Sequence, residues 1–308
     1  MAANAVEVVD LRKSYGPVQA LRGVSFTVAE GEVFALLGPN GAGKTTTVEI
    51  LEGFRHRDGG RASVLGFDPA SGSRRLKEQM GIVLQTSGVD PYLTVAETVD
   101  MFRGYYPKPR SRDEVLQLVG LEDKRDSRVT RLSGGQKRRL DVAIALAGDP
   151  SMLFLDEPTS GFDPGAKRNA WEVIKGLAGL GKTIFLTSHS MDEVQYLADR
   201  VVIIAAGKIV AEGTPESLMG ARPATTTVRF RVPPIPLPES LQKSARLDGE
   251  NIELETDDPT QALFELTSWA MQSAMSLDGL QVTRPSLEDV YLEITGEAET
   301  GGVVSERR

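Results

Sequence analysis

The sequence predicts an α/β fold with a mostly parallel sheet, followed by a small C-terminal α+β domain. Continuous apolar runs, which are typical of strands buried on both faces, alternate with helical patterns. A proline-dense stretch from Val232 to Pro238 then interrupts regular structure and indicates a nearby domain boundary. We therefore expect domains at residues 1–220 and 221–296, with residues 297–308 as a disordered tail because they have no periodicity.

Composition bounds the class of protein. The 308 residues are 40% hydrophobic. They include 35 Lys and Arg and 43 Asp and Glu, and the resulting net charge of −8 argues against nucleic acid as a main partner. The absence of cysteine and the presence of only two histidines, His56 and His189, argue against disulfides and zinc. Apolar runs such as 201–206 are too short to span a membrane, and no signal peptide is apparent, so a cytoplasmic location is expected.

The first elements follow from hydrophobic periodicity. Residues 6–11 and 24–28 read as strands, and alternation of apolar and polar residues in the second predicts a half-buried sheet. The apolar run 33–37 predicts a fully buried strand. A glycine-rich loop follows it, and a helical pattern begins at Thr45.

Strand signals stop between residues 88 and 130, which predicts a helical subdomain. Two capping boxes support it, one from Thr94 to Glu97 and one from Ser111 to Glu114. The remaining elements are then expected as strands at 152–155, 183–187 and 201–205, helices at 165–178 and 191–198, and a hairpin turn at Ala206-Gly207 leading to a strand at 209–211.

The C-terminal domain carries weaker signals. Strands are expected at 226–232 and 251–255, and Asp258 with Pro259 predicts the start of a helix. A further helix is expected to begin at Ser286, with Leu287, Val290 and Tyr291 on one face, most simply for core packing.

A glycine-rich segment predicts phosphate binding. It matches G-x-x-x-x-G-K-[ST] after a buried strand and before a helix, where backbone amides and the helix N-terminus attract an anion. Lys44 is expected to reach the phosphates and Thr45 to ligate Mg²⁺. The nucleotide-binding residues predicted here are Gly38, Pro39, Asn40, Gly41, Ala42, Gly43, Lys44, Thr45 and Thr46.

Two adjacent carboxylates end a predicted buried strand. Asp156 at the strand tip is expected to hold Mg²⁺, and Glu157 is expected to polarise the attacking water as general base. Taken alone, the pair could equally be a solvated acidic strand end.

The segment Leu132-Ser133-Gly134-Gly135-Gln136 is the most specific motif in the chain. It places a second anion site, Ser133 and the following amides, at a helix N-terminus, although a plain serine-capped helix is the simpler alternative. With this LSGGQ string, residues 5–220 resemble the ATP-binding-cassette (ABC) family. The resemblance implies a P-loop NTPase domain with a parallel core, an antiparallel β subdomain and a helical subdomain.

The resemblance also implies roles for residues that carry little signal by themselves. ATP is expected to lie between the Walker A loop of one subunit and the signature, Ser133, Gly134, Gly135 and Gln136, of a second copy in a head-to-tail dimer. Gln85 resembles the glutamine that contacts Mg²⁺ and the attacking water, and His189 the switch histidine that contacts the γ-phosphate. Tyr15 resembles the aromatic residue that stacks on adenine, and Asp163 the acid that crosses the dimer interface. His56 is assigned no role.

The run from Pro285 to Glu293 resembles the closing motif of the daunorubicin-type drug-resistance exporter ATPases. We therefore expect the Mg²⁺-dependent ATPase subunit of an exporter for a drug-like or other small hydrophobic molecule, working with a separate membrane permease at the cell membrane. Catalysis is expected from Lys44, Glu157 and His189. A heterodimer, and a soluble ABC ATPase acting on nucleic acid or ribosomes, remain alternatives.

Overall fold

The structure of the chain is a computed structural model, which describes residues 3–84, 88–220, 226–283 and 291. The chain forms two compact units: the first extends to Pro215, and the second begins at Glu216. This division lies five residues before the boundary that the composition predicts.

A six-stranded sheet forms the centre of the first unit, and the predicted α/β class is confirmed. Neighbouring strands are parallel except for the last, β9, which pairs with β8 in the hairpin predicted at Ala206-Gly207. Leu37 in the middle of the sheet is fully buried, as a strand covered on both faces requires. In spatial order the strands are β5 (Met80–Val83), β6 (Met152–Asp156), β7 (Thr183–Ser188), β3 (Val33–Leu37), β8 (Arg200–Ala205) and β9 (Lys208–Gly213).

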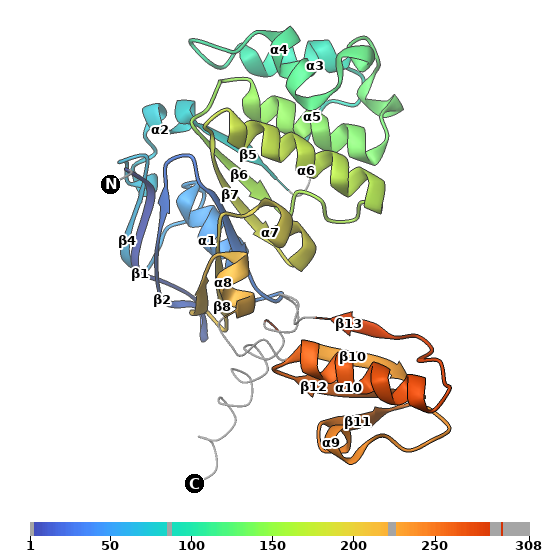
Figure 1. The fold of residues 1–308 in the computed structure, drawn as a ribbon. Coiled ribbons are helices and arrows are strands. Elements are labelled where there is room, and N and C mark those ends of the chain that lie inside the picture. Colours follow the sequence, from blue (N-terminus) through green and yellow to red (C-terminus); the bar gives the residue numbers. More distant parts are fainter. Residues whose placement is uncertain (1–2, 85–87, 221–225, 284–290, 292–308) are drawn as a thin grey trace. The chain divides into compact units, whose positions relative to one another are not determined.

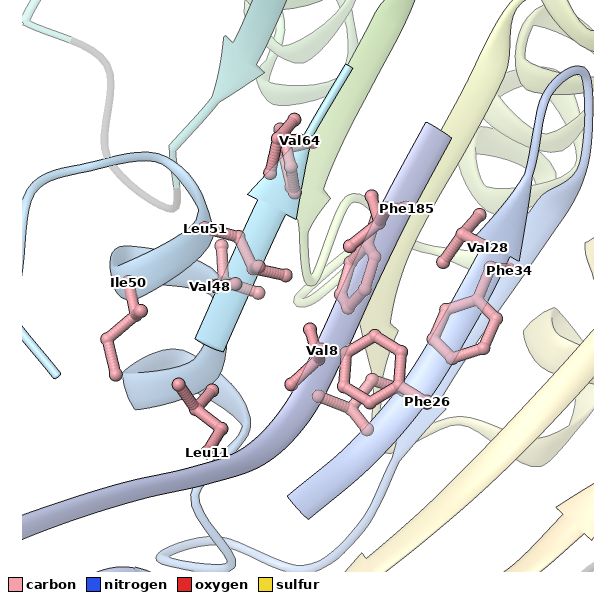
Figure 2. Close-up of a cluster of buried hydrophobic side chains, with 14 of the residues drawn as sticks. Val8, Leu11, Phe26, Val28, Phe34, Val48, Ile50, Leu51, Val64 and Phe185 are labelled. Carbon is pink, nitrogen blue, oxygen red and sulfur yellow. The ribbon is translucent and has the colours of Figure 1, made fainter. Parts of the chain in front are cut away.

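A three-stranded antiparallel sheet packs beside this centre. Its order is β2 (Val18–Ala29), β1 (Asn4–Tyr15) and β4 (Gly59–Val64), and β4 was not predicted. Buried residues of both sheets and of α1 (Lys44–Leu51) form one core, shown in Figure 2. At its centre the rings of Phe26 and Phe34 stack at 5.2 Å, and Phe185 lies 5.1 Å from Phe34.

Helices cover the other face of the six-stranded sheet (Figure 1). They are α5 (Gly134–Leu146), α6 (Pro164–Gly179) and α7 (Met191–Leu197). The predicted helical region contains α3 (Val95–Arg103) and α4 (Arg112–Val119), while α2 (Arg74–Gln79) precedes β5. Thr94 and Glu97 form the predicted capping box, but Ser111 only accepts from the amide of Glu114, so the second box is half formed.

The second unit contains a four-stranded antiparallel sheet in the order β11, β12, β10, β13. Val228, Phe230, Leu254 and Leu266 are the most buried members of its separate core. The predicted helix at Ser286 and the tail lie outside the described residues. The elements are α8 (Pro215–Gly220), which begins at the boundary, β10 (Thr226–Arg231), α9 (Glu239–Gln242), β11 (Ala245–Asp248), β12 (Asn251–Thr256), α10 (Pro259–Gln272) and β13 (Gln281–Thr283).

In the described ranges, no helix has both the length and the apolar character needed to cross a membrane.

Candidate active site

The Walker A loop connects β3 to α1, as predicted. The ammonium of Lys44 is buried and donates to the carbonyl oxygens of Gly38, at 2.7 Å, and Pro39, at 3.1 Å. Burial lowers the pKa of Lys44, and the negative charges of Glu157 and Asp156 partly oppose this effect. The loop therefore holds a positive charge close to both carboxylates.

Two loop glycines are required by the fold itself. A Cβ added at Gly38 would lie 2.3 Å from the carbonyl oxygen of Ile204 in β8. Gly43 has φ +108°, and its added Cβ would lie 2.7 Å from the carbonyl oxygen of Ala20 in β2. Close approach by β2 and β8 thus fixes the conformation of the loop. Glycine-rich loops of this kind direct backbone amides towards phosphate.

The two predicted carboxylates lie at the carboxyl end of β6, where β7 positions them. Thr187 of β7 is fully buried, and its hydroxyl donates to Oδ1 of Asp156 at 2.5 Å. The backbone amide of Glu157 donates to the carbonyl oxygen of Thr187 at 3.2 Å and to its hydroxyl at 3.1 Å. A single threonine on the neighbouring strand therefore fixes both acids.

His189 reaches the second carboxylate from the end of β7. Its Nδ1 lies 3.2 Å from Oε1 of Glu157, whose side chain is 16% exposed while that of His189 is 55% exposed. The strand order β6, β7, β3 brings Asp156 and Glu157, His189 and the Walker A loop to one edge of the sheet. The structure therefore brings Lys44 and both acids together with His189, as the motifs predicted.

The donor set is compatible with Mg²⁺. The described residues contain no group of three or more His, Cys, Asp or Glu side chains suited to hold a metal. Mg²⁺ at nucleotide sites needs only one or two protein oxygens, because substrate phosphates and water complete its shell. Asp156 and the hydroxyl of Thr45 supply oxygens of this kind, whereas Gln85 lies outside the described residues.

A buried glutamate lies at the end of the Walker A helix. Glu52 is 6% exposed, and burial together with the charges of Asp156 and Glu49 raises its pKa to about 8. The raised pKa favours the protonated, uncharged form of Glu52 at neutral pH. Sequence analysis did not identify it, because nothing in the local pattern shows that its side chain is buried.

The signature segment lies at the N-terminus of α5. Ser133 and Gln136 form a capping box, in which the hydroxyl accepts from the amide of Gln136 at 3.3 Å and the amide of Ser133 donates to Oε1 of Gln136 at 2.9 Å. Ser133, Gly135 and Gln136 line a cavity of about 360 Å³ together with Asp163. Asp163 also caps α6 by accepting from the amide of Ala166 at 2.9 Å. The signature and Asp163 are therefore neighbours within one subunit.

A second buried acid connects the segment after β6 to the end of β7. Glu193 of α7 is 2% exposed and accepts from the hydroxyls of Thr159, at 2.7 Å, and Ser188, at 2.6 Å. The indole of Trp171 in α6 donates to the same carboxylate at 3.1 Å. Glu193 thereby ties the chain after Glu157 to the chain before His189.

Tyr15 lies at the end of β1 and is 40% exposed. The guanidinium of Arg55 lies 5.2 Å from its ring centroid and the ammonium of Lys13 lies 5.7 Å away. Its predicted stacking on adenine remains a prediction.

Known proteins match this chain in sequence and in structure. A family model described as "ABC transporter" matches residues 21–160, and one described as "ABC transporter domain-containing protein-like, C-terminal domain" matches residues 226–286. The "Nod factor export ATP-binding protein I" of Rhizobium sp. (strain N33) is 38% identical over 307 residues, which cover 96% of this chain and 98% of that protein. The protein of the same name from Burkholderia orbicola (strain AU 1054) is 36% identical, and the match covers 96% of this chain and 98% of that protein.

The chain belongs to the ABC transporter family. As an ABC ATP-binding subunit, it resembles cbiO1 from Clostridium perfringens, part of the ABC transporter complex cbiONQ, with TM-score 0.63 and 29% identity over 70% of this chain and 91% of that one. A second similar structure is a dimeric ATP-binding cassette in a post-hydrolysis state, bound to ADP and Pi. Its TM-score is 0.60, and it is 25% identical over 68% of this chain and 98% of that chain. This ABC subunit is therefore an ATP-binding ATPase.

Proposed function

We propose that this ABC ATPase powers export of a drug-like or other small hydrophobic molecule through a separate membrane permease. The supporting observation is the similarity to export ATP-binding proteins, which extends over 96% of the chain and so includes the second unit. In this proposal the chain acts at the cytoplasmic face of the membrane, and its helical region around α3 and α4 contacts the permease.

Two copies of the chain bind two ATP molecules in the proposed cycle. Each ATP lies between the Walker A loop of one copy and the signature of the other, and Asp163 contributes to the interface. The signature side chain Ser133 is exposed at the start of α5, which suits contact with a second molecule. The similarity to a dimeric ADP-bound cassette supports this arrangement.

The proposed chemistry is attack of water on the γ-phosphate. Lys44 exchanges its carbonyl partners for phosphate oxygens, Glu157 accepts the proton of the attacking water, and His189 orients Glu157 and contacts the γ-phosphate. Thr45, Asp156 and Gln85 are the proposed Mg²⁺ ligands. Bound Mg²⁺ would neutralise phosphate charge that develops during transfer.

The first experiment is phosphate release by the purified chain with Mg²⁺ and with EDTA. Wild type should hydrolyse ATP only with Mg²⁺. Glu157→Gln should lose at least about 100-fold in kcat, because the amide cannot accept the proton, yet accumulate an ATP-bound dimer in size-exclusion chromatography. Glu250→Gln, an exposed change in the second unit, is the matched control. Hydrolysis by Glu157→Gln at the wild-type rate would contradict the assigned base.

Export is tested separately. Affinity purification from membranes should retain a multispanning membrane protein together with the tagged chain. Co-reconstituted vesicles should then move a fluorescent amphiphilic dye when ATP is added to the side that carries the chain. Retention of ribosomes or nucleic acid in place of a membrane protein would support the soluble ABC ATPase and overturn the exporter.

A further inference from the structure

Arg138 is a buried arginine in the second turn of the signature helix α5. It is 8% exposed, and burial lowers its pKa although the nearby carboxylates of Asp141 and Asp156 oppose the effect. Burying a guanidinium is costly unless hydrogen bonds compensate for its lost water. Its partners therefore indicate what this charge does for the fold.

The partners are backbone carbonyl oxygens of the catalytic segments. Nη2 donates to the carbonyl oxygen of Asp156 at 2.9 Å, and Nε donates to that of Pro158 at 3.1 Å. Nη1 donates to the carbonyl oxygen of Leu84 and lies 3.8 Å from Oδ2 of Asp141. One planar guanidinium thus joins the end of β5 to the residues on both sides of Glu157.

The position of Glu157 needs such support. Its φ of +45° lies in the left-handed region, which costs a residue with a Cβ about 1–2 kcal/mol. Thr187 holds its amide from β7, while Arg138 holds the carbonyls before and after it from α5. The two sets of hydrogen bonds approach from different elements and together define the backbone at this residue.

We propose that Arg138 is a positioning residue for Glu157, and that it couples the signature helix to the catalytic carboxylate of the same subunit. The inference rests on the proposed dimer, in which each ATP lies between the Walker A loop of one subunit and the signature of the other. When the second subunit's nucleotide engages Ser133 at the start of α5, a shift of this helix moves the guanidinium and, with it, the peptide groups around Glu157. Each site thereby adjusts hydrolysis in the other.

The shape of the side chain makes the proposal specific. A guanidinium presents several N–H groups in a fixed planar fork, whereas an ammonium is a compact charge on a flexible chain. Lysine at position 138 keeps the charge, but it cannot reproduce the three carbonyl contacts in the same geometry. Arg138→Lys therefore separates positioning from charge.

The test compares Arg138→Lys with wild type by steady-state phosphate release. We expect kcat to fall between about tenfold and 100-fold, as small misplacements of catalytic groups do, while KM for ATP stays within about twofold. Dimer formation in ATP should persist in the Glu157→Gln background. A wild-type kcat for Arg138→Lys would overturn the inference, whereas failure of wild type itself to hydrolyse ATP would overturn the proposed function.

Arg200→Lys is the matched control. The side chain of Arg200 is 25% exposed, and its guanidinium binds Glu32 and the carbonyl oxygen of Thr27. It lies at the amino end of β8, away from the sheet edge that holds Glu157. An equal loss of kcat in this control would show a general effect of arginine loss and overturn the inference. If Arg138→Lys does not fold, Arg138→Gln, which buries no charge, should show the same selective loss of kcat.

Mixed dimers test the coupling. One subunit carries Glu157→Gln, so that hydrolysis comes only from the Glu157 of the other subunit. Arg138→Lys in the subunit with the intact glutamate should abolish most of this hydrolysis, and in the Glu157→Gln subunit it should leave most of it. The opposite pattern would show that Arg138 acts through its signature on the other subunit's nucleotide, and would overturn the inference.

Discussion

The two segments predicted to bind phosphate, the Walker A loop and the signature, differ in whether the fold of the subunit requires their glycines. At Gly38 and Gly43 an added Cβ would approach a backbone carbonyl oxygen within 2.3 Å and 2.7 Å. At Gly134 it would meet no atom within 4 Å, and at Gly135 only the Cβ of Ala166 at 3.5 Å. The folded subunit thus requires the first pair of glycines but does not require the second.

In the proposed dimer, this difference separates a loop that is fixed within its own subunit from a segment that acts on the second subunit's nucleotide. The Walker A loop is packed between β2 and β8, and its lysine already has partners in the subunit. The signature lies at an exposed helix start, and in the proposed dimer the first amides of this helix bind the nucleotide of the second subunit. Substitutions in the two segments should therefore fail differently, in folding for one and in assembly for the other.

The largest expected effect is that of Gly38→Ala. Because the new methyl group would overlap the carbonyl oxygen of Ile204, the free energy of unfolding should fall by about 1–3 kcal/mol or more. Urea denaturation followed by circular dichroism measures it. Gly176→Ala, at an open position in α6, should instead leave stability equal or raise it by up to about 1 kcal/mol. Equal stability of Gly38→Ala and wild type would contradict the tight packing.

Gly134→Ala should affect assembly and not folding. Its urea midpoint should match that of wild type, since the methyl group has open space, whereas ATP hydrolysis should fall by roughly 100-fold as the methyl group obstructs the second subunit's nucleotide. Size-exclusion chromatography of Gly134→Ala in the Glu157→Gln background should show monomer in ATP. A stable dimer with normal hydrolysis would contradict the proposal that the signature glycine is needed for assembly.

Glu52 gives the Walker A region its own dependence on pH. Its pKa of about 8 in the fold exceeds its unfolded value of 4.5, so the folded state binds the extra proton between these pH values. Stability should therefore decrease as pH rises from 6 to 8, by on the order of 1 kcal/mol per pH unit. Glu52→Gln should be less sensitive to pH and more stable at pH 8. If Glu52→Gln showed the same pH dependence of stability as wild type, Glu52 would not be the group responsible for it.

The smallest effect is expected from loss of the signature cap. Ser133→Ala should lower the free energy of unfolding by about 1 kcal/mol, because the amide of Gln136 loses its acceptor. Ser133→Asp keeps a cap and should retain stability, yet its negative charge should repel phosphate and reduce hydrolysis. If Ser133→Asp hydrolyses ATP normally, the signature does not contact phosphate.

Sequence patterns predicted the buried elements best. The run 33–37 was assigned as a strand with its exact bounds, because strands covered on both faces have continuous apolar runs. The strand β4 was missed, because Gly59 and Gly60 open it and it depends on pairing with β1. The helix α2 was missed because Leu76 is its only buried side chain. The pairing of β4 and the packing of α2 depend on residues distant in the chain, which the local sequence pattern does not show.

The candidate site divides in the same way. Motifs predicted the positions of Lys44, Asp156, Glu157 and His189, since each lies at or after the end of a strand and these ends meet at the same edge of the sheet. The supporting residues Thr187, Glu193 and Arg138 could not be predicted. Their roles depend on the register of β6 with β7 and on the packing of helices over that edge.

The backbone of Glu157 also has an evolutionary consequence. A glycine at this position would adopt φ +45° without steric cost, so selection for stability alone would favour replacing the glutamate. In this chain glutamate occupies the position at about 1–2 kcal/mol of conformational penalty. A lineage released from ATP hydrolysis should therefore drift towards glycine or asparagine here, and its subunits should become more thermostable as they lose turnover.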